Sequence, residues 1–528
     1  MVNDHSVRND LPLRAALLVV LVGTLLILPR FGHRHVVGSH EAVFPIVARD
    51  ILARHAWFHA ELRGMPYRNK PPLYPWAIAV VSWPAGRVTE LTSRLPGALA
   101  AIGAAAVTSL LGASLFGARA GLWSGVMLLT STLFFDHALT VIPDMPMVLF
   151  DLLAGLALWA VSNGAGRGAL LGFYVALALA VFTKGIPGLL PLAVGLVWLT
   201  IDEGRGGIRR LLWSPGVVLF AAITAVWALP YVISERFGSE VLWRDWLRGP
   251  LGSLALHTLA QQLAYLWLGF LPWALVLPIA IVAAVRARRV RPVAFALCWF
   301  VVQGLCVLAV QQQRLRYLLP LLPGAALLVA WWADREATAV RARPILAATT
   351  FGVSCTAVLL VPSALHHYGI LAAIPQWEIG LMMVGVLAVG AVAAASLWTA
   401  QLGRGLPMIA ATSALVLFAG GWILDDWEKH AFDYPGVATG LRTIEPPLAV
   451  VALADDHELL QVDFYLGRAL RPLRSADDVR RHLATIGGAV LVEGPRWRSA
   501  DQWLQIDRHD LRTDALGADV FLVTNAPR

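Results

Sequence analysis

The chain has few charged residues and very few lysines. Only 14% of its 528 residues are charged and 58% are hydrophobic, whereas an average soluble domain carries roughly 25% charged residues. The only lysines are Lys70, Lys184 and Lys429, so arginine supplies nearly all of the positive charge. This composition excludes an ordinary soluble domain of this length and predicts a membrane protein.

Cysteine and the common nucleotide-binding motifs are also scarce. The chain has three cysteines, Cys298, Cys306 and Cys355, and their spacing fits neither a metal site nor a disulfide framework. We interpret them as small apolar packing residues within membrane spans. The sequence contains no GxGxxG or phosphate-loop pattern, no internal repeat and no low-complexity tract.

The net charge of +8 does not indicate a nucleic-acid-binding protein. Most arginines lie in short segments between apolar runs, where positive charge sets the orientation of a membrane protein. The expected neighbours of these arginines are therefore the anionic head groups of membrane lipids.

Apolar runs of membrane-spanning length recur along most of the chain, and the mean hydropathy is +0.66. A run of about 20 residues crosses the bilayer core of about 30 Å as a helix. The first run is not followed by a cleavage site, so we interpret it as a retained span. The sequence predicts about 13 spans, at residues 11–29, 95–116, 120–136, 145–161, 168–183, 186–201, 214–231, 263–285, 292–310, 317–333, 344–364, 378–400 and 406–424.

The arginine-rich loops predict the orientation. Residues 205–210 and 286–291, together with Arg8 and Arg14 before the first span, should lie on the cytoplasmic side. An odd number of spans then places the C-terminus outside, which in a bacterial inner membrane is the periplasm. This result depends on a split between two spans at Lys184 and Gly185.

Two predicted outer segments are too long to be simple turns, at about 30–94 and 232–262. The first contains HEAVFPIVARDILARHAW, whose apolar stripe predicts a helix lying in the plane of the interface. From about residue 430, strand-like and helix-like pieces alternate. We therefore predict an all-α polytopic transmembrane domain over residues 1–425 and a small periplasmic α/β domain over 430–528.

Charged residues gather where four predicted spans or segments meet the outer side: His40-Glu41, Asn69-Lys70, Asp144 and Lys184. Taken singly, a carboxylate at a helix start is more often a cap, and a lysine at a span end is more often an interfacial anchor. Their coincidence on one side indicates a site. A point cation neutralises a lipid phosphate, and a nearby carboxylate or imidazole accepts a hydroxyl proton.

The order of these motifs resembles the protein O-mannosyltransferase-like superfamily of GT-C glycosyltransferases. The ordered segments are HEAVFPIVARDILARHAWF, RGMPYRNKPPLYPW, TSRLPGALAA, VIPDMPMVLF, FTKGIPGLLPL and RLRYLLPLLPGAALL. The resemblance is strongest to the bacterial branch of aminoarabinose (lipid A) transferases and runs from about residue 35 to 330. It implies a GT-C fold and sugar transfer from a polyprenyl-phosphate donor.

The resemblance also implies roles for particular residues, with two departures from the family pattern. The family's first-loop Asp-Glu pair is His40-Glu41 here, so the implied proton acceptor is His40, Glu41 or Asp144. The family's Glu-Lys-Pro-Pro is Asn69-Lys70-Pro-Pro, which retains the lysine and loses the acid. By resemblance the donor phosphate is bound by Lys70, Arg94, Lys184 and Arg316, and the substrates are positioned by Asn69, Arg314 and Tyr317.

The predicted function is an inverting membrane glycosyltransferase of the cell envelope whose acceptor is a lipid, glycan or protein hydroxyl on the periplasmic face. No cofactor is firmly implied, and the two departures weaken any divalent-metal site. The alternatives are a flippase of lipid-linked intermediates and a non-catalytic membrane scaffold. A flippase should have repeated halves and charges near the middle of the bilayer, whereas the candidate charges here lie at span ends.

Overall fold

The computed structural model describes residues 4–67, 69–233, 256–309, 314–335, 376–398, 402–442, 444, 448–453, 457–485, 488–504 and 511–525. The chain divides into two compact units. The first, here called the bundle unit, comprises Met1–Phe31, Arg68–Tyr74 and Pro96–Ile423. The second, here called the sheet unit, comprises Gly32–Tyr67, Pro75–Leu95 and Leu424–Arg528.

The bundle unit is helical, and α3 (Leu73–Ser82), α4 (Glu90–Phe116) and α19 (Leu402–Ala431) run through its boundaries with the sheet unit. Its other elements are α1 (Asp4–Ile27), η1 (Leu28–Arg30), α5 (Ala118–Leu129), α6 (Thr132–His137), α7 (Asp144–Ser162), α8 (Arg167–Lys184), η3 (Ile186–Leu189), α9 (Leu190–Glu203), α10 (Arg205–Leu212), α11 (Pro215–Ile233), α13 (Leu256–Gly269), η5 (Trp273–Leu275), α14 (Leu277–Arg286), α15 (Arg291–Leu308), η6 (Leu315–Leu321), α16 (Leu322–Arg335) and α18 (Gln376–Trp398).

Within the described part of the chain, eight helical segments are long and apolar enough to cross a membrane, and the bent pair of α10 and α11 would make a ninth. The eight are Leu11–Arg30, Glu90–Phe116, Asp144–Ser162, Arg167–Lys184, Ile186–Glu203, Arg291–Leu308, Leu315–Arg335 and Ile409–Leu441. The chain is therefore a multi-pass membrane protein, as predicted. The count of 13 stays a prediction, and the predicted span 344–364 and most of segment 232–262 lie outside the described residues.

Two predicted spans are wrong as single helices. The span at 120–136 is divided into α5 and α6 at Thr130 and Ser131, whose hydroxyls donate to the carbonyls of Val126 and Leu128 at 2.7 and 2.8 Å. Such local side-chain bonds favour helix ends. The span at 263–285 is divided into α13, η5 and α14, because Pro272 cannot continue a helix after Gly269.

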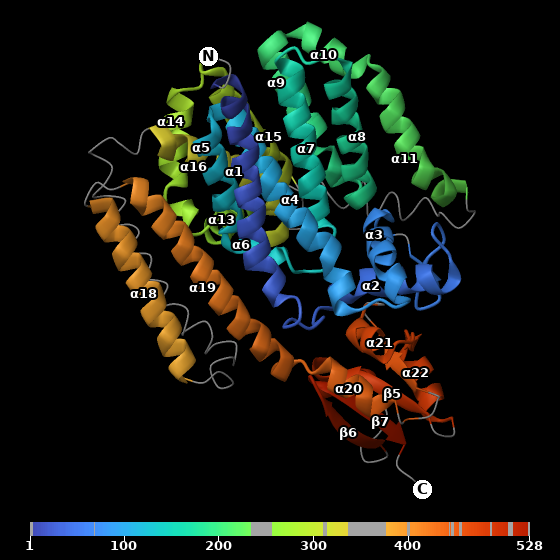
Figure 1. Ribbon diagram of the computed structural model, residues 1–528. Coiled ribbons are helices and arrows are strands. Elements are labelled where there is room, and N and C mark those ends of the chain that lie inside the picture. The colour runs from blue at the N-terminus through green and yellow to red at the C-terminus, as the bar shows by residue number, and fades with distance from the viewer. Residues whose placement is uncertain are drawn as a thin grey trace. The chain divides into compact units, whose positions relative to one another are not determined.

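The split at Lys184 and Gly185 is present, and it makes α7 and α8 an antiparallel hairpin. The two helices have 19 and 18 residues and are joined by residues 163–166, so they lie side by side along their whole length (Figure 1). Further packing within the unit joins α8 to α11, α16 to α5, α5 to α1 and α15 to α9. A hairpin of two helices of equal length brings the start of α7 to the end of α8.

Close packing between α7 and α15 gives a stability prediction at Gly155. A Cβ atom there would lie 2.0 Å from the Trp299 ring, which is fully buried. We expect Gly155→Ala to destabilise the protein by about 1–3 kcal/mol or more, measured as a lower melting temperature in detergent. Gly172→Ala in α8 is the control, because nothing lies within 4 Å of its Cβ position. Equal melting temperatures for the two variants would contradict this packing.

The sheet unit combines segments near the N-terminus with the C-terminal part of the chain. Its N-terminal segments contain α2 (Ser39–Arg54), β1 (Glu61–Leu62), β2 (Met65–Pro66) and η2 (Trp83–Ala85). Helix α2 lies where a helix was predicted, and it buries Ala42, Ile46, Ala48 and Ile51. Its predicted placement in the membrane interface stays a prediction.

The second part of the sheet unit is a five-stranded α/β domain, as predicted. The strand order is β4-β3-β5-β7-β6; β3 is parallel to β4 and β5, and β7 is antiparallel to β5 and β6. The elements are α20 (Tyr434–Leu441), β3 (Leu448–Val451), α21 (Leu460–Leu466), β4 (Arg471–Leu473), α22 (Ala476–Leu483), β5 (Ala489–Glu493), α23 (Gly494–Arg498), α24 (Ala500–Trp503), β6 (Leu511–Gly517) and β7 (Val520–Asn525).

Alternating strand residues build a core on each face of this sheet, because successive side chains point to opposite faces. Val450 and Leu491 belong to one core, with residues of α20 and α21. Val451 and Val490 belong to the other, with residues of α22. Helix α21 is thus fixed to the domain by its apolar residues, and its polar residues remain for other contacts.

Candidate active site

The end of the α7–α8 hairpin carries two of the predicted site residues. Asp144 is the first residue of α7, after Pro143, and Lys184 is the last residue of α8. A carboxylate at a helix N-terminus and an ammonium at a C-terminus both suit the helix dipole. Gly185, which follows Lys184, has φ 77° and ψ −135°, a backbone conformation that is essentially restricted to glycine.

Asp144 and Lys184 form a buried ion pair. Lys184 Nζ donates to Asp144 Oδ1 at 2.5 Å, and the two side chains are 8% and 2% exposed, respectively. Nζ of Lys184 also lies 5.1 Å from the centre of the Tyr317 ring, within the range of a cation–π contact. The pairing was not predicted, although both residues were.

Arg316 brings a second cation to this end of the hairpin. It interacts electrostatically with Asp144, and its Nε is buried without a hydrogen-bond partner in the described part of the chain. We call Asp144, Lys184, Arg316 and Tyr317 the hairpin site. Two cations and one carboxylate leave one net positive charge, which suits an anion such as a phosphate.

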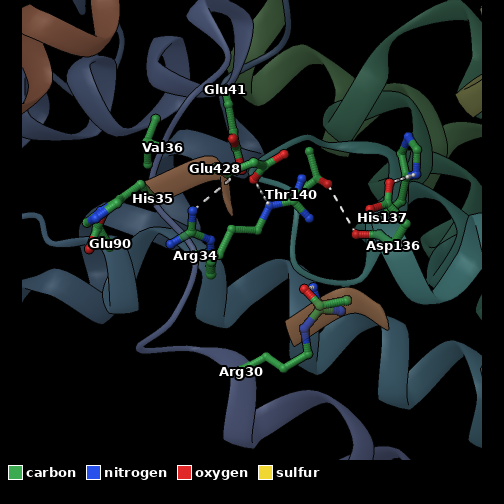
Figure 2. Close-up of polar contacts among 12 residues, drawn as sticks. Arg30, Arg34, His35, Val36, Glu41, Glu90, Asp136, His137, Thr140 and Glu428 are labelled. Atoms are coloured by element: carbon green, nitrogen blue, oxygen red, sulfur yellow. Dashed lines mark hydrogen bonds and ion pairs between the residues drawn. The ribbon is translucent and has the colours of Figure 1, made fainter. Parts of the chain in front are cut away.

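Residues beside the hairpin site add polar groups. His137 also interacts electrostatically with Asp144. Figure 2 shows His137 and Asp136 next to each other, with His137 Nδ1 3.2 Å from Asp136 Oδ2. Arg314 is exposed, and its carbonyl accepts from the backbone N–H of Tyr317 at 3.0 Å. Arg314 was predicted to position substrate, and here its backbone helps to fix Tyr317.

Lys70 and Asn69 also belong to the bundle unit. Lys70 Nζ donates to the Asn69 side-chain oxygen at 3.3 Å. Asn69 is exposed and Lys70 is partly exposed, so neither is built into the core. Asn69 is a neutral amide, whereas the acid that the resemblance implies at position 69 would offset the charge of Lys70.

The remaining candidates, His40, Glu41 and Arg94, lie in the sheet unit. Glu41 lies in the first turn of α2 and is buried with Arg94, at 3.8 Å between Oε1 and Nη2. His40 is exposed, and its ring centre lies 5.4 Å from that of His457. Glu41 is therefore buried beside a cation, whereas the exposed imidazole of His40 is the accessible proton acceptor on α2.

A second polar cluster in the sheet unit was not predicted. Figure 2 shows His35 next to Glu90, with His35 Nδ1 3.0 Å from Glu90 Oε1. The Tyr465 hydroxyl donates to the same carboxylate, and burial together with the charge of Glu90 raises the pKa of Tyr465. The tyrosine therefore remains a neutral donor at physiological pH.

Buried polar residues in the bundle unit were also missed. Gln303 Nε2 donates to Asp151 Oδ2 at 2.8 Å. Asp151 Oδ1 and Gln303 Oε1 are buried without partners in the residues that the structure describes. Asp151 could have been noticed, because a carboxylate within a span is uncommon and because it follows Asp144 by two helical turns.

No metal site is evident in the described ranges, where no three or more His, Cys, Asp or Glu residues cluster as ligands.

Comparison with known proteins adds to this geometry. Residues 69–234 match the dolichyl-phosphate-mannose-protein mannosyltransferase family. The chain is similar to an undecaprenyl phosphate-alpha-4-amino-4-deoxy-L-arabinose arabinosyl transferase of Pectobacterium atrosepticum, with 26% identity over 64% of this chain and 62% of the relative. A second relative, the arabinosyl transferase of the same name numbered 1 in Sodalis glossinidius, is 27% identical over 64% of this chain and 63% of its own length.

Solved structures extend the similarity to nearly the whole chain. Apo ArnT from Cupriavidus metallidurans superposes with a TM-score of 0.79 over 98% of both chains, at 21% identity. This chain has the GT-C fold. An oligosaccharyltransferase from Archaeoglobus fulgidus superposes with a TM-score of 0.52 over 98% of this chain and 74% of its own, at 11% identity.

The resemblance predicted from the ordered motifs is therefore confirmed, and so is the predicted fold class. The aligned region spans just under two thirds of the length of the two arabinosyl transferases.

Proposed function

We propose that this chain is an integral membrane glycosyltransferase. It transfers a sugar from a polyprenyl-phosphate donor to a hydroxyl of a lipid acceptor. The observation that carries the proposal is the hairpin site, where a buried carboxylate lies with Lys184 and Arg316 at one end of two spans. The phosphate of a lipid carrier lies at the membrane surface, where the ends of spans also lie. A site with a net positive charge at that level would bind the phosphate.

The relatives support the donor class. The arabinosyl transferases are named for undecaprenyl phosphate-linked aminoarabinose, and ArnT has been solved bound to undecaprenyl phosphate. From these we infer a polyprenyl phosphate as the carrier and a lipid as the acceptor. A glycan or protein acceptor belongs to the same reaction class and is distinguished by experiment.

The proposed reaction is one in-line displacement at the anomeric carbon. The bond from this carbon to the phosphate oxygen breaks, and a bond to the acceptor oxygen forms on the opposite face, which inverts the configuration. The polyprenyl phosphate leaves with the electron pair, and its charge is stabilised by Lys70, Lys184 and Arg316 with Arg94. The acceptor proton passes to a base, for which the candidates are Asp144, Glu41 and His40.

The location follows the same inference. We propose a bacterial inner membrane, with a cytoplasmic N-terminus and the 430–528 domain in the periplasm, attached to a transmembrane domain over residues 1–425. Asn69, Arg314 and Tyr317 then position the substrates at the periplasmic face. Labelling of single cysteines placed at residues 8 and 498 by a membrane-impermeant reagent tests this orientation.

A transfer assay tests the function. Purified protein in lipid nanodiscs is incubated with a panel of radiolabelled polyprenyl-phosphate sugars and acceptor lipids. The expected result is label in the acceptor with equimolar release of polyprenyl phosphate. A protein that transfers no sugar from any donor but moves labelled donor across proteoliposomes would instead be a flippase, and one that does neither would be a scaffold.

A further inference from the structure

Helix α2 carries two of the candidate bases, His40 and Glu41. Helix α21 of the C-terminal domain makes polar contacts with the start of α2 and with the residues just before it. Ser39 Oγ donates to Gln461 Oε1 at 3.0 Å, and Gln461 Nε2 donates to the Val37 carbonyl at 2.6 Å. The backbone N–H of Val36 donates to the Tyr465 hydroxyl at 2.8 Å. All of these residues belong to the sheet unit.

The strongest of the contacts is a buried ion pair. Arg63 donates to Asp463 through two parallel bonds, Nε to Oδ2 at 2.7 Å and Nη2 to Oδ1 at 2.9 Å. The two side chains are 2% and 0% exposed. A bidentate pair of this kind fixes orientation as well as distance.

Arg63 and Gly64 form the two-residue turn between β1 and β2, a turn in which both residues have positive φ. The φ of Arg63 is +52°, a left-handed conformation that a residue with a Cβ rarely adopts. Arg63 Nη1 also donates to the Glu458 carbonyl at 2.9 Å, just before α21. The hairpin turn therefore presents Arg63 to α21.

Helix α2 itself contacts the middle of α21. Arg49, which belongs to α2, donates to the Asp463 carbonyl at 3.0 Å. The same carbonyl also accepts from the backbone N–H of Gly467 at 3.2 Å. The position of α2 is therefore coupled to α21 at two places along α2, Ser39 and Arg49.

The contacts reach the candidate base directly. His457, just before α21, places its ring against that of His40. We infer that α21 is a clamp that positions the His40–Glu41 turn for catalysis, with Asp463 and Tyr465 as positioning residues. This inference rests on the proposed function and assigns the C-terminal domain a part in the chemical step.

The test compares Asp463→Asn with wild type. A neutral amide breaks the pair and leaves the Arg63 charge buried, which displaces the segment that carries α2. We expect kcat to fall by about 10–100-fold, since a displacement of about 1 Å costs on this order, with the donor KM changed by less than about threefold. Hydrogen exchange of the α2 amides, residues 39–54, should become faster.

Two further variants separate positioning from folding. The double variant Arg63→Met, Asp463→Leu replaces the pair with apolar side chains and should recover kcat to within about threefold, because a matched apolar pair is tolerated where a single break is not. Asp519→Asn is the control: it breaks the exposed bidentate Arg498–Asp519 pair at 3.0 Å in the same domain, and should leave kcat unchanged.

Unchanged kcat in Asp463→Asn, or a loss equal to that in Asp519→Asn, would overturn the clamp. So would unchanged exchange in α2. If the wild-type protein transfers no sugar from any donor, the proposed function fails, and the exchange measurement still decides whether α21 holds α2 in place.

Discussion

Replacing Asp144 by Asn should lower kcat for sugar transfer by about 10²–10⁴-fold, the range over which a positioned base acts. The carboxylate lies 2.5 Å from Lys184 Nζ and is almost fully buried. An amide neither accepts the acceptor proton nor balances the lysine charge, so both candidate roles of Asp144 are lost together. The measurement is the rate of label transfer at saturating donor, and Asp144→Glu should retain part of it.

Asp151→Asn is the matched control for this prediction. The same substitution is made on the same helix two turns away, and the new amide can donate to Gln303 Oε1, which is buried without a partner among the described residues. We therefore expect kcat within about twofold of wild type, since the added hydrogen bond offsets the change. Equal losses in the two variants would mean that α7 is sensitive to any exchange of Asp for Asn, and would contradict a specific role for Asp144.

Lys70→Ala should raise the donor KM by about 10–150-fold, the equivalent of a charge-assisted hydrogen bond of about 1.5–3 kcal/mol. Its ammonium is partly exposed and lies beside a neutral amide, and a point cation binds a phosphate well. Lys70→Arg should retain part of the affinity, because it keeps the charge and changes the geometry. The measurement is transfer rate against donor concentration.

Lys429→Ala is the comparison for Lys70. It removes the same ammonium from a residue that lies 3.3 Å from a His33 ring nitrogen in the sheet unit. We expect its donor KM to equal that of wild type. A Lys70→Ala enzyme with an unaltered KM would contradict the assignment of Lys70 to the donor phosphate and would leave it as an interfacial anchor.

The part of the site that could be predicted is the part set by local sequence. Apolar runs of span length gave α7 and α8, and the glycine after Lys184 ended the second of them. A short connection then requires Asp144 and Lys184 to lie at the same end of the hairpin. Their functional role could be predicted because a charged residue within or beside a membrane span is costly and is often retained for function.

What could not be predicted depends on contacts between distant parts of the chain. His40 and His457, or Arg63 and Asp463, show no pattern that relates them, because spacing carries information only within an element. The division of span 263–285 depends on Pro272. The hydrophobicity averaged over this run does not show that a proline interrupts the helix. The edge strands β4 and β6 are hard to predict from sequence because β4 has only three residues and β6 is mostly exposed.

The Arg63–Asp463 pair has a consequence for the order in which the protein matures. Its partners are 400 residues apart, so at about 5–20 residues per second the ribosome delivers Asp463 about 20–80 s after Arg63. During that interval the C-terminal domain has not been synthesised, so Arg63 and the residues just before α2 lack their partners in α21. The protein therefore acquires a positioned His40–Glu41 turn only after α21 has been synthesised, and a chain cut short before α21 has its spans without the proposed clamp.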